Sequence, residues 1–178
     1  LPDQKKERFI KDYSLNAYEA NVLVSEKEIS DYFEEVVKTS DIKLAKNWIT
    51  GDLFASLNDK NISISESPIK AKEMASLINT ISSGLISGRA AKEVFEVMKD
   101  AGGDPVEIIE KKGLKQKSDP KELEVLIDRI LDENKDKVAE YKSGKDKLFG
   151  FFVGQSMKVS GGTANPKLVN DILKKKLK

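Results

Sequence analysis

Residues 141–178, YKSGKDKLFGFFVGQSMKVSGGTANPKLVNDILKKKLK, carry the most ordered pattern in this chain of 178 residues. From Lys142 onward the segment contains nine Lys and two Asp, a net charge of +7. The residues before Lys142 contain 22 basic and 28 acidic side chains, a net charge of −6. The nearly neutral chain therefore has a strongly positive carboxyl-terminal segment.

The spacing of apolar residues in this segment predicts a helix over residues 145–159. Its apolar face would be made of Leu148, Phe149, Phe152, Val153 and Met157. Gly150 and Gly154 fall one turn apart inside that helix. A glycine inside a helix costs about 1 kcal/mol relative to alanine, so this pair needs a reason. We expect another helix or a nucleic-acid backbone to approach closely there.

A second helix is predicted after the turn at Ser160-Gly161-Gly162-Thr163. Asn165 is the expected N-cap, and Pro166 suits the first helical position, where its missing N–H costs nothing. Apolar residues occupy one face, and most of the other face is basic, with Lys167, Lys174, Lys175 and Lys178.

Cap signals and helical periodicity predict further helices along the rest of the chain. The expected caps are Asp3, Ser14, Asp41, Ser67, Ser87, Asp104 and Asp119, together with a capping box at Ser25-Glu26-Lys27-Glu28. Tyr18 is expected to face inward, and Asn58–Glu66 is expected to be a loop. No alternating strand of useful length appears, so the predicted fold is all-α. We expect two small helical domains, residues 1–116 and 117–178, joined by a short linker at Lys115–Ser118.

The composition excludes several classes of chemistry. The chain has no Cys and no His, which removes thiol nucleophiles, imidazole bases, disulfides and zinc sites built on those residues. We can assign no catalytic residue and no metal ligand, and we expect no cofactor in this fragment. No apolar run approaches the roughly 18 residues of a membrane span, so we expect no membrane partner. The absence of Cys fits a reducing compartment, and we expect a cytoplasmic location. Leu1 is not an initiator Met, so we interpret the chain as a fragment of a longer protein.

The lysines around the glycine turn are candidate nucleic-acid contacts. The predicted binding residues are Lys145, Lys147, Lys158, Gly161, Gly162, Lys167 and Lys174. Backbone N–H groups at a glycine turn and at a helix N-terminus can receive a phosphate. The alternative is a solvated helix end, because lysine favours the last turn of any helix. Of the three phenylalanines, Phe149 and Phe152 are expected in the core, whereas Phe151 would be exposed for stacking or would meet the other helical domain.

The run GK-x-K-x-x-GFFVGQ-x-MK-x-x-GG-x-ANPKLVN-x-x-L-x-x-KL resembles the carboxyl-terminal end of the GatB subunit of the aspartyl/glutamyl-tRNA amidotransferase, a domain shared with the YqeY proteins. The resemblance extends upstream through Asn47-Trp48, Ile86-Ser87-Gly88 and the EKKGLKQ run from Glu110 to Gln116. It covers essentially the whole chain. The chain departs from the family at Thr163, where a Lys is usual, and at Ser160, where Thr is frequent.

The resemblance implies a role in a glutamine-hydrolysing, ATP-dependent ligase that amidates Glu-tRNA(Gln) or Asp-tRNA(Asn). Its partners would be tRNA, an amidase subunit and a small bridging subunit. ATP and Mg²⁺ would bind an N-terminal domain that this fragment lacks, so the fragment would be non-catalytic and would hold the tRNA. The alternative is a helical protein-docking scaffold without direct RNA contact.

Overall fold

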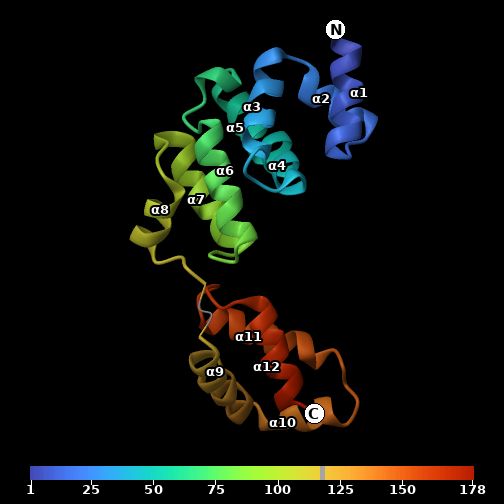
Figure 1. The fold of residues 1–178 in the computed structure, drawn as a ribbon. Coiled ribbons are helices and arrows are strands. Elements are labelled where there is room, and N and C mark those ends of the chain that lie inside the picture. The colour runs from blue at the N-terminus through green and yellow to red at the C-terminus, as the bar shows by residue number, and fades with distance from the viewer. Residues whose placement is uncertain (117–118) are drawn as a thin grey trace. The chain divides into compact units, whose positions relative to one another are not determined.

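Helices make up the regular structure of the chain in the computed structural model, which describes residues 1–116 and 119–178 (Figure 1). No strand occurs among these residues, so the predicted all-α fold class is confirmed. In chain order the elements are α1 (Pro2–Tyr13), α2 (Ala17–Val24), α3 (Lys27–Val37), α4 (Ile42–Trp48), the π-helical turn η1 (Ile49–Leu53), α5 (Phe54–Lys60), the 3₁₀ turn η2 (Ile64–Glu66), α6 (Ala71–Ser82), α7 (Gly88–Ala101), α8 (Pro105–Lys112), α9 (Pro120–Glu133), α10 (Lys135–Lys142), α11 (Leu148–Val159) and α12 (Pro166–Lys176).

The chain divides into two compact units. The helical unit consists of residues 1–83 and 92–112, and the tail unit consists of residues 84–91 and 113–178. Within the tail unit, the Gln116 N–H donates to the Leu85 carbonyl at 2.8 Å and so joins its two segments. Residues 117 and 118 of the predicted linker lie outside the described residues. The predicted division into 1–116 and 117–178 therefore stays a prediction.

Apolar stripes form the core of the helical unit, as their helical period predicts. The fully or almost fully buried side chains include Phe33, Val36, Trp48, Leu53, Met74, Leu77, Ile78, Val94, Phe95 and Met98. Two predicted caps are confirmed, one in the helical unit and one, Ser87, in the tail unit. Asp41 accepts from the Leu44 N–H at 2.8 Å, and Ser87 accepts from the Ala90 N–H at 3.1 Å. Each cap satisfies a backbone donor that the first turn of a helix leaves without an intrahelical partner.

The first two helix starts differ from the sequence prediction. The N-cap of α1 is Leu1 rather than Asp3, because the helix already begins at Pro2. Ser14 does not start α2 but ends α1, in the left-handed conformation with a φ of 52°. A capping box lies instead at Asn16, whose side chain accepts from the Glu19 N–H at 2.8 Å.

This later start changes the face that α2 buries. Ala20 and Leu23 are fully buried, whereas Tyr18, predicted to face inward, is 78% exposed. The capping box predicted at Ser25 is also wrong. The Ser25 hydroxyl donates to the Val22 carbonyl at 2.8 Å, so it closes the end of α2 and is not available to cap α3.

The region predicted as one loop, Asn58–Glu66, is partly helical. Helix α5 continues to Lys60, and η2 occupies the last three residues of the region. Ser67 does not begin the following helix, since its hydroxyl accepts from the Ile69 N–H at 3.1 Å and α6 starts only at Ala71.

The helices α9 to α12 build the tail unit around one apolar core. Its buried members are Leu123, Ile127, Ile130, Phe152, Ala164, Val169, Leu173 and Leu177. Both α11 and α12 pack on α9 and on each other (Figure 1). Asp119 caps α9 by accepting from the Lys121 N–H at 2.9 Å, as predicted. Helix α11 starts three residues later than predicted, because residues 146 and 147 lie in a turn that precedes it.

None of the described helices combines the length and the apolar character that a bilayer span requires.

Candidate nucleic-acid interface

The turn between α11 and α12 uses its own backbone donors. Gly161 and Gly162 have φ angles of 64° and 79°, a conformation that glycine adopts without strain. The Gly161 N–H donates to the Lys158 carbonyl at 3.1 Å, and the Gly162 N–H donates to the Met157 carbonyl at 2.8 Å. The Thr163 N–H is satisfied as well, by the Ser160 carbonyl at 3.2 Å. This geometry ends α11 and occupies the backbone donors of the turn.

The backbone N–H groups at the N-terminus of α12 are also satisfied by a group of the same turn. Asn165 Oδ1 accepts from the Lys167 N–H at 3.0 Å and from the Leu168 N–H at 3.3 Å, which confirms Asn165 as the N-cap. The sequence suggested that the backbone N–H groups of this corner would receive a phosphate. Since these donors are already occupied, the anion-binding capacity of the corner lies in its lysine side chains.

Four of the predicted lysines, Lys147, Lys158, Lys167 and Lys174, are exposed, and no ion pair is found for them within the described residues. They lie towards the two ends of α11 and of α12. Lys145 differs, because its ammonium donates to Glu140 at 3.0 Å. Both partners of that pair are solvent-exposed, and such a pair contributes little to stability.

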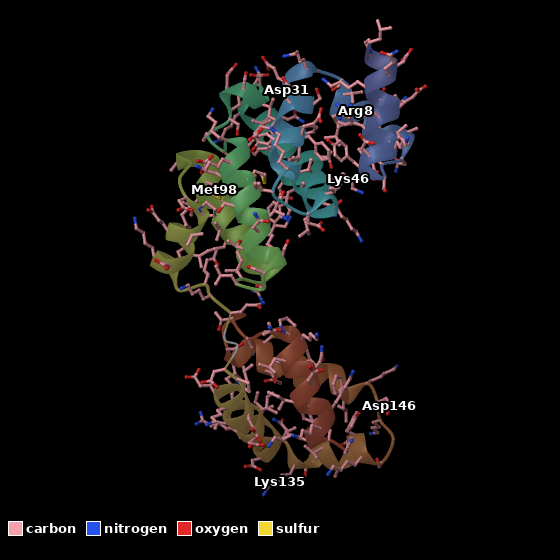
Figure 2. The ribbon with its side chains drawn as sticks, viewed as in Figure 1. Arg8, Asp31, Lys46, Met98, Lys135 and Asp146 are labelled. Carbon is pink, nitrogen blue, oxygen red and sulfur yellow. The ribbon has the colours of Figure 1, made fainter. Side chains whose placement is uncertain are left out.

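The segment before α11 contains one carboxylate among its lysines. Asp146 lies between Lys145 and Lys147, in the connection from α10 (Figure 2). On α12, Asp171 occupies a similar place between Lys167 and Lys174, at a spacing of four and three residues. The solvent-facing stripe of α12 is thus mainly, but not purely, basic.

Lys176 has a different role from its neighbours. Its ammonium bonds Glu124 at 2.8 Å and Asp128 at 2.9 Å, so it links α12 to α9. The hydrogen bond to Glu124, followed by the one to Asp128, raises the pKa of the Lys176 ammonium. The sequence prediction did not distinguish this residue within the Lys174–Lys176 run. Its spacing of three residues from the buried Leu173 was the available signal, because that spacing places it beside the inner face.

The outer face of α11 has an unusual composition. Lys147, Gly150, Gly154 and Lys158 follow one another at intervals of three, four and four residues, and all four are exposed. A Cβ added to either glycine would have no other atom within 4 Å. Close approach of another helix, one of the two predicted reasons for these glycines, is therefore not found within the tail unit. At a rise of about 1.5 Å per residue, Lys147 and Lys158 are about 16 Å apart along the helix axis. Between them, no side chain projects at Gly150 or at Gly154.

The phenylalanines of α11 pack inward. Phe152 is fully buried, as predicted, and Phe149 packs on Tyr141 with a ring-centroid distance of 6.2 Å. Phe151 was predicted to be exposed or to contact the other domain. It is half-buried within the tail unit, against Phe152 at 5.4 Å and under the Lys137 ammonium at 3.8 Å from the ring centroid, and its predicted contact with the other domain stays a prediction. No phenylalanine of this helix is exposed for base stacking.

The described part of the chain contains no group of three Asp or Glu side chains placed to hold a metal ion.

Comparisons with known proteins give the chain a family. The model of the GatB domain matches residues 31–177. The GatB subunit of the aspartyl/glutamyl-tRNA(Asn/Gln) amidotransferase from Pelagibacter ubique is 63% identical over 99% of this chain. The corresponding proteins from Ehrlichia ruminantium and Thioalkalivibrio sulfidiphilus are each 50% identical over 99% of the chain. The chain spans 37 to 38% of the length of these relatives. It therefore belongs to the GatB family, together with these subunits of the aspartyl/glutamyl-tRNA(Asn/Gln) amidotransferase.

Proposed function

We propose that the chain is the tRNA-binding part of the GatB subunit of a tRNA-dependent amidotransferase. It would hold Glu-tRNA(Gln) or Asp-tRNA(Asn) while the amino acid on the tRNA is converted into its amide. The observation that carries this proposal is the family match over residues 31–177, together with the exposed lysines of α11 and α12.

The charge pattern favours a polyanion such as RNA as the partner of this surface. Lys147, Lys158, Lys167 and Lys174 are exposed point charges without a carboxylate partner in the described residues. Flexible ammonium groups suit the phosphates of a folded RNA, where binding depends on backbone shape more than on base sequence. The bare surface at Gly150 and Gly154 would let a sugar–phosphate backbone approach α11 without meeting a side chain.

The chemistry of amidation would take place elsewhere in the enzyme. The chain has no Cys or His, and the residues in the candidate interface are lysines and glycines, which suit binding rather than nucleophilic or acid–base catalysis. ATP and Mg²⁺ would bind in the remaining part of the whole protein. The amidase subunit and a small bridging subunit would be the protein partners, and the complex would act in the cytoplasm.

Fluorescence anisotropy with transcribed tRNA(Gln) and tRNA(Asn) tests the proposal on residues 1–178. We expect binding that weakens steeply with salt and that is tighter for folded tRNA than for an unstructured RNA of the same length. Failure to bind either tRNA at low salt would refute the role. Salt-insensitive capture of a protein subunit without tRNA would instead favour the docking scaffold.

A further inference from the structure

A shallow groove of about 350 Å³ lies on the tail unit, and none of the predicted RNA-binding lysines lines it. Helix α9 supplies most of its lining, with Glu122, Val125, Leu126, Arg129 and Glu133, and the last residue of α11, Val159, lines it as well. All of these residues belong to the tail unit. The groove is therefore a feature of one compact unit.

Two large apolar side chains in this groove are exposed to solvent. Val125 is 64% exposed and Val159 is 56% exposed, and they come from different helices. Single exposed apolar residues are ordinary, but two that line the same groove form a surface that another molecule can cover. Val125 lies between the buried Leu123 and the half-buried Leu126, so it is not part of the stripe that packs into the core.

More of the groove's charged lining residues are acidic than basic. Glu122 and Glu133 are exposed, and no ion pair is found for either within the described residues. Arg129 is the single cation among the lining residues. Two further carboxylates of α9, Glu124 and Asp128, already share the Lys176 ammonium. Glu122 and Glu133 are thus the carboxylates of α9 that line the groove with the two exposed valines.

We propose that this groove binds a segment of another protein chain that places a large apolar side chain against Val125 and Val159 and a lysine or arginine beside Glu122 and Glu133. The carboxylates repel RNA phosphates, so the groove would not compete with the lysines of α11 and α12 for the same partner. Burial of the valines supplies the attraction, and the charges select a basic segment. This inference does not depend on RNA binding by the lysines.

Site-specific photocrosslinking in the full-length protein, purified with the proteins that assemble with it, tests the proposal. The photoreactive amino acid p-benzoylphenylalanine replaces Val125 in one variant and Val159 in another, and Ala139, an exposed residue of α10, serves as the control position. Crosslinked peptides are identified by mass spectrometry. We expect the two groove positions to crosslink to the same segment of another chain, which contains apolar residues next to Lys or Arg. The control position should not label that segment.

A charge-reversal variant then tests the selection for basic segments. Glu122→Lys with Glu133→Lys should reduce the yield of the crosslink from the groove about tenfold, because two attractive charge pairs become repulsive. Asp146→Lys with Asp171→Lys makes the same charge change elsewhere in the tail unit and should leave the yield unchanged. Circular dichroism of each variant would confirm that its helix content is intact. Crosslinks to RNA, to the same chain, or to scattered or acidic segments would overturn the proposal, as would absence of crosslinks or equal yields from both charge-reversed variants.

Discussion

Removal of the unpaired lysines should make tRNA binding less sensitive to salt. The test variant changes Lys147, Lys158 and Lys167 to alanine. These side chains are exposed and have no ion pair in the described structure, so their loss should not disturb the fold. If each neutralises one phosphate, the slope of log affinity against log salt should become less negative by about 0.7 to 0.9 for each lysine, or roughly 2 to 2.7 in all.

The change in this salt slope determines how much tRNA affinity the three lysines contribute at each salt concentration. Between 50 and 200 mM salt, a slope of 2 to 2.7 corresponds to an affinity change of about 20- to 40-fold. The three lysines would account for this part of the loss of tRNA affinity between the two salt concentrations. The variant without them should therefore lose less affinity, by the same factor. Fluorescence anisotropy with labelled tRNA at five or more salt concentrations measures both slopes.

The matched control removes three other exposed lysines of the tail unit, Lys121, Lys135 and Lys142. It makes the same change in net charge, so a long-range effect of charge would appear equally in both variants. Equal slopes for the test and control variants would refute the assignment of phosphate contacts to the lysines of α11 and α12. An unchanged slope in both variants would show that none of these six lysines neutralises a phosphate.

Three further predictions concern stability and pH. Phe152→Ala should destabilise the tail unit by about 3 to 5 kcal/mol in urea unfolding followed by circular dichroism, because the ring is fully buried. Gly154→Ala should raise the free energy of unfolding by up to about 1 kcal/mol and yet weaken tRNA binding, since the site is helical and open; an unchanged affinity would contradict RNA approach there. The hydrogen bond from Arg8, together with one from Tyr13, lowers the pKa of the Glu34 carboxyl. The ionised Glu34 should therefore stabilise the fold at neutral pH, and this stabilisation should be lost as the pH falls below about 4. Thermal unfolding of Arg8→Ala and of the unchanged chain should therefore converge in acid, and a constant difference would contradict the linkage.

Much of this fold follows from local sequence, because caps and apolar period act within a few residues of each other. Asp41, Ser87, Asp119 and Asn165 were predicted as caps, and each accepts a backbone N–H of the next helix. In these cases the side-chain oxygen directly precedes a clear apolar repeat. Where only a few residues separate two helices, a serine between them can close the end of the first helix or cap the start of the second. At Ser25 the hydroxyl closes the preceding helix, and no local signal decides between the two uses.

The candidate site was less predictable, since its properties depend on tertiary packing. The sequence shows the lysines, but it does not show that Lys176 reaches two carboxylates of α9. It shows Gly150 and Gly154, but only the structure shows that the space above both is open. The exposed groove at Val125 and Val159 was missed altogether, because these two residues belong to different helices and are 34 positions apart in the chain.

The division of charge within the tail unit has a physical consequence for binding. Lys176 is held by Glu124 and Asp128, so the ion pairs between α9 and α12 keep these carboxylates from opposing a bound polyanion. The same pairs leave Lys167 and Lys174 on the outer face of α12 with only Asp171 among them. Replacement of Lys176 by methionine would thus remove one positive charge that is already paired with α9 and would release two negative charges. We expect that variant to bind tRNA more weakly than Lys175→Met, an equal charge change at an exposed neighbour; equal affinities would show that the α9 carboxylates have no influence on binding.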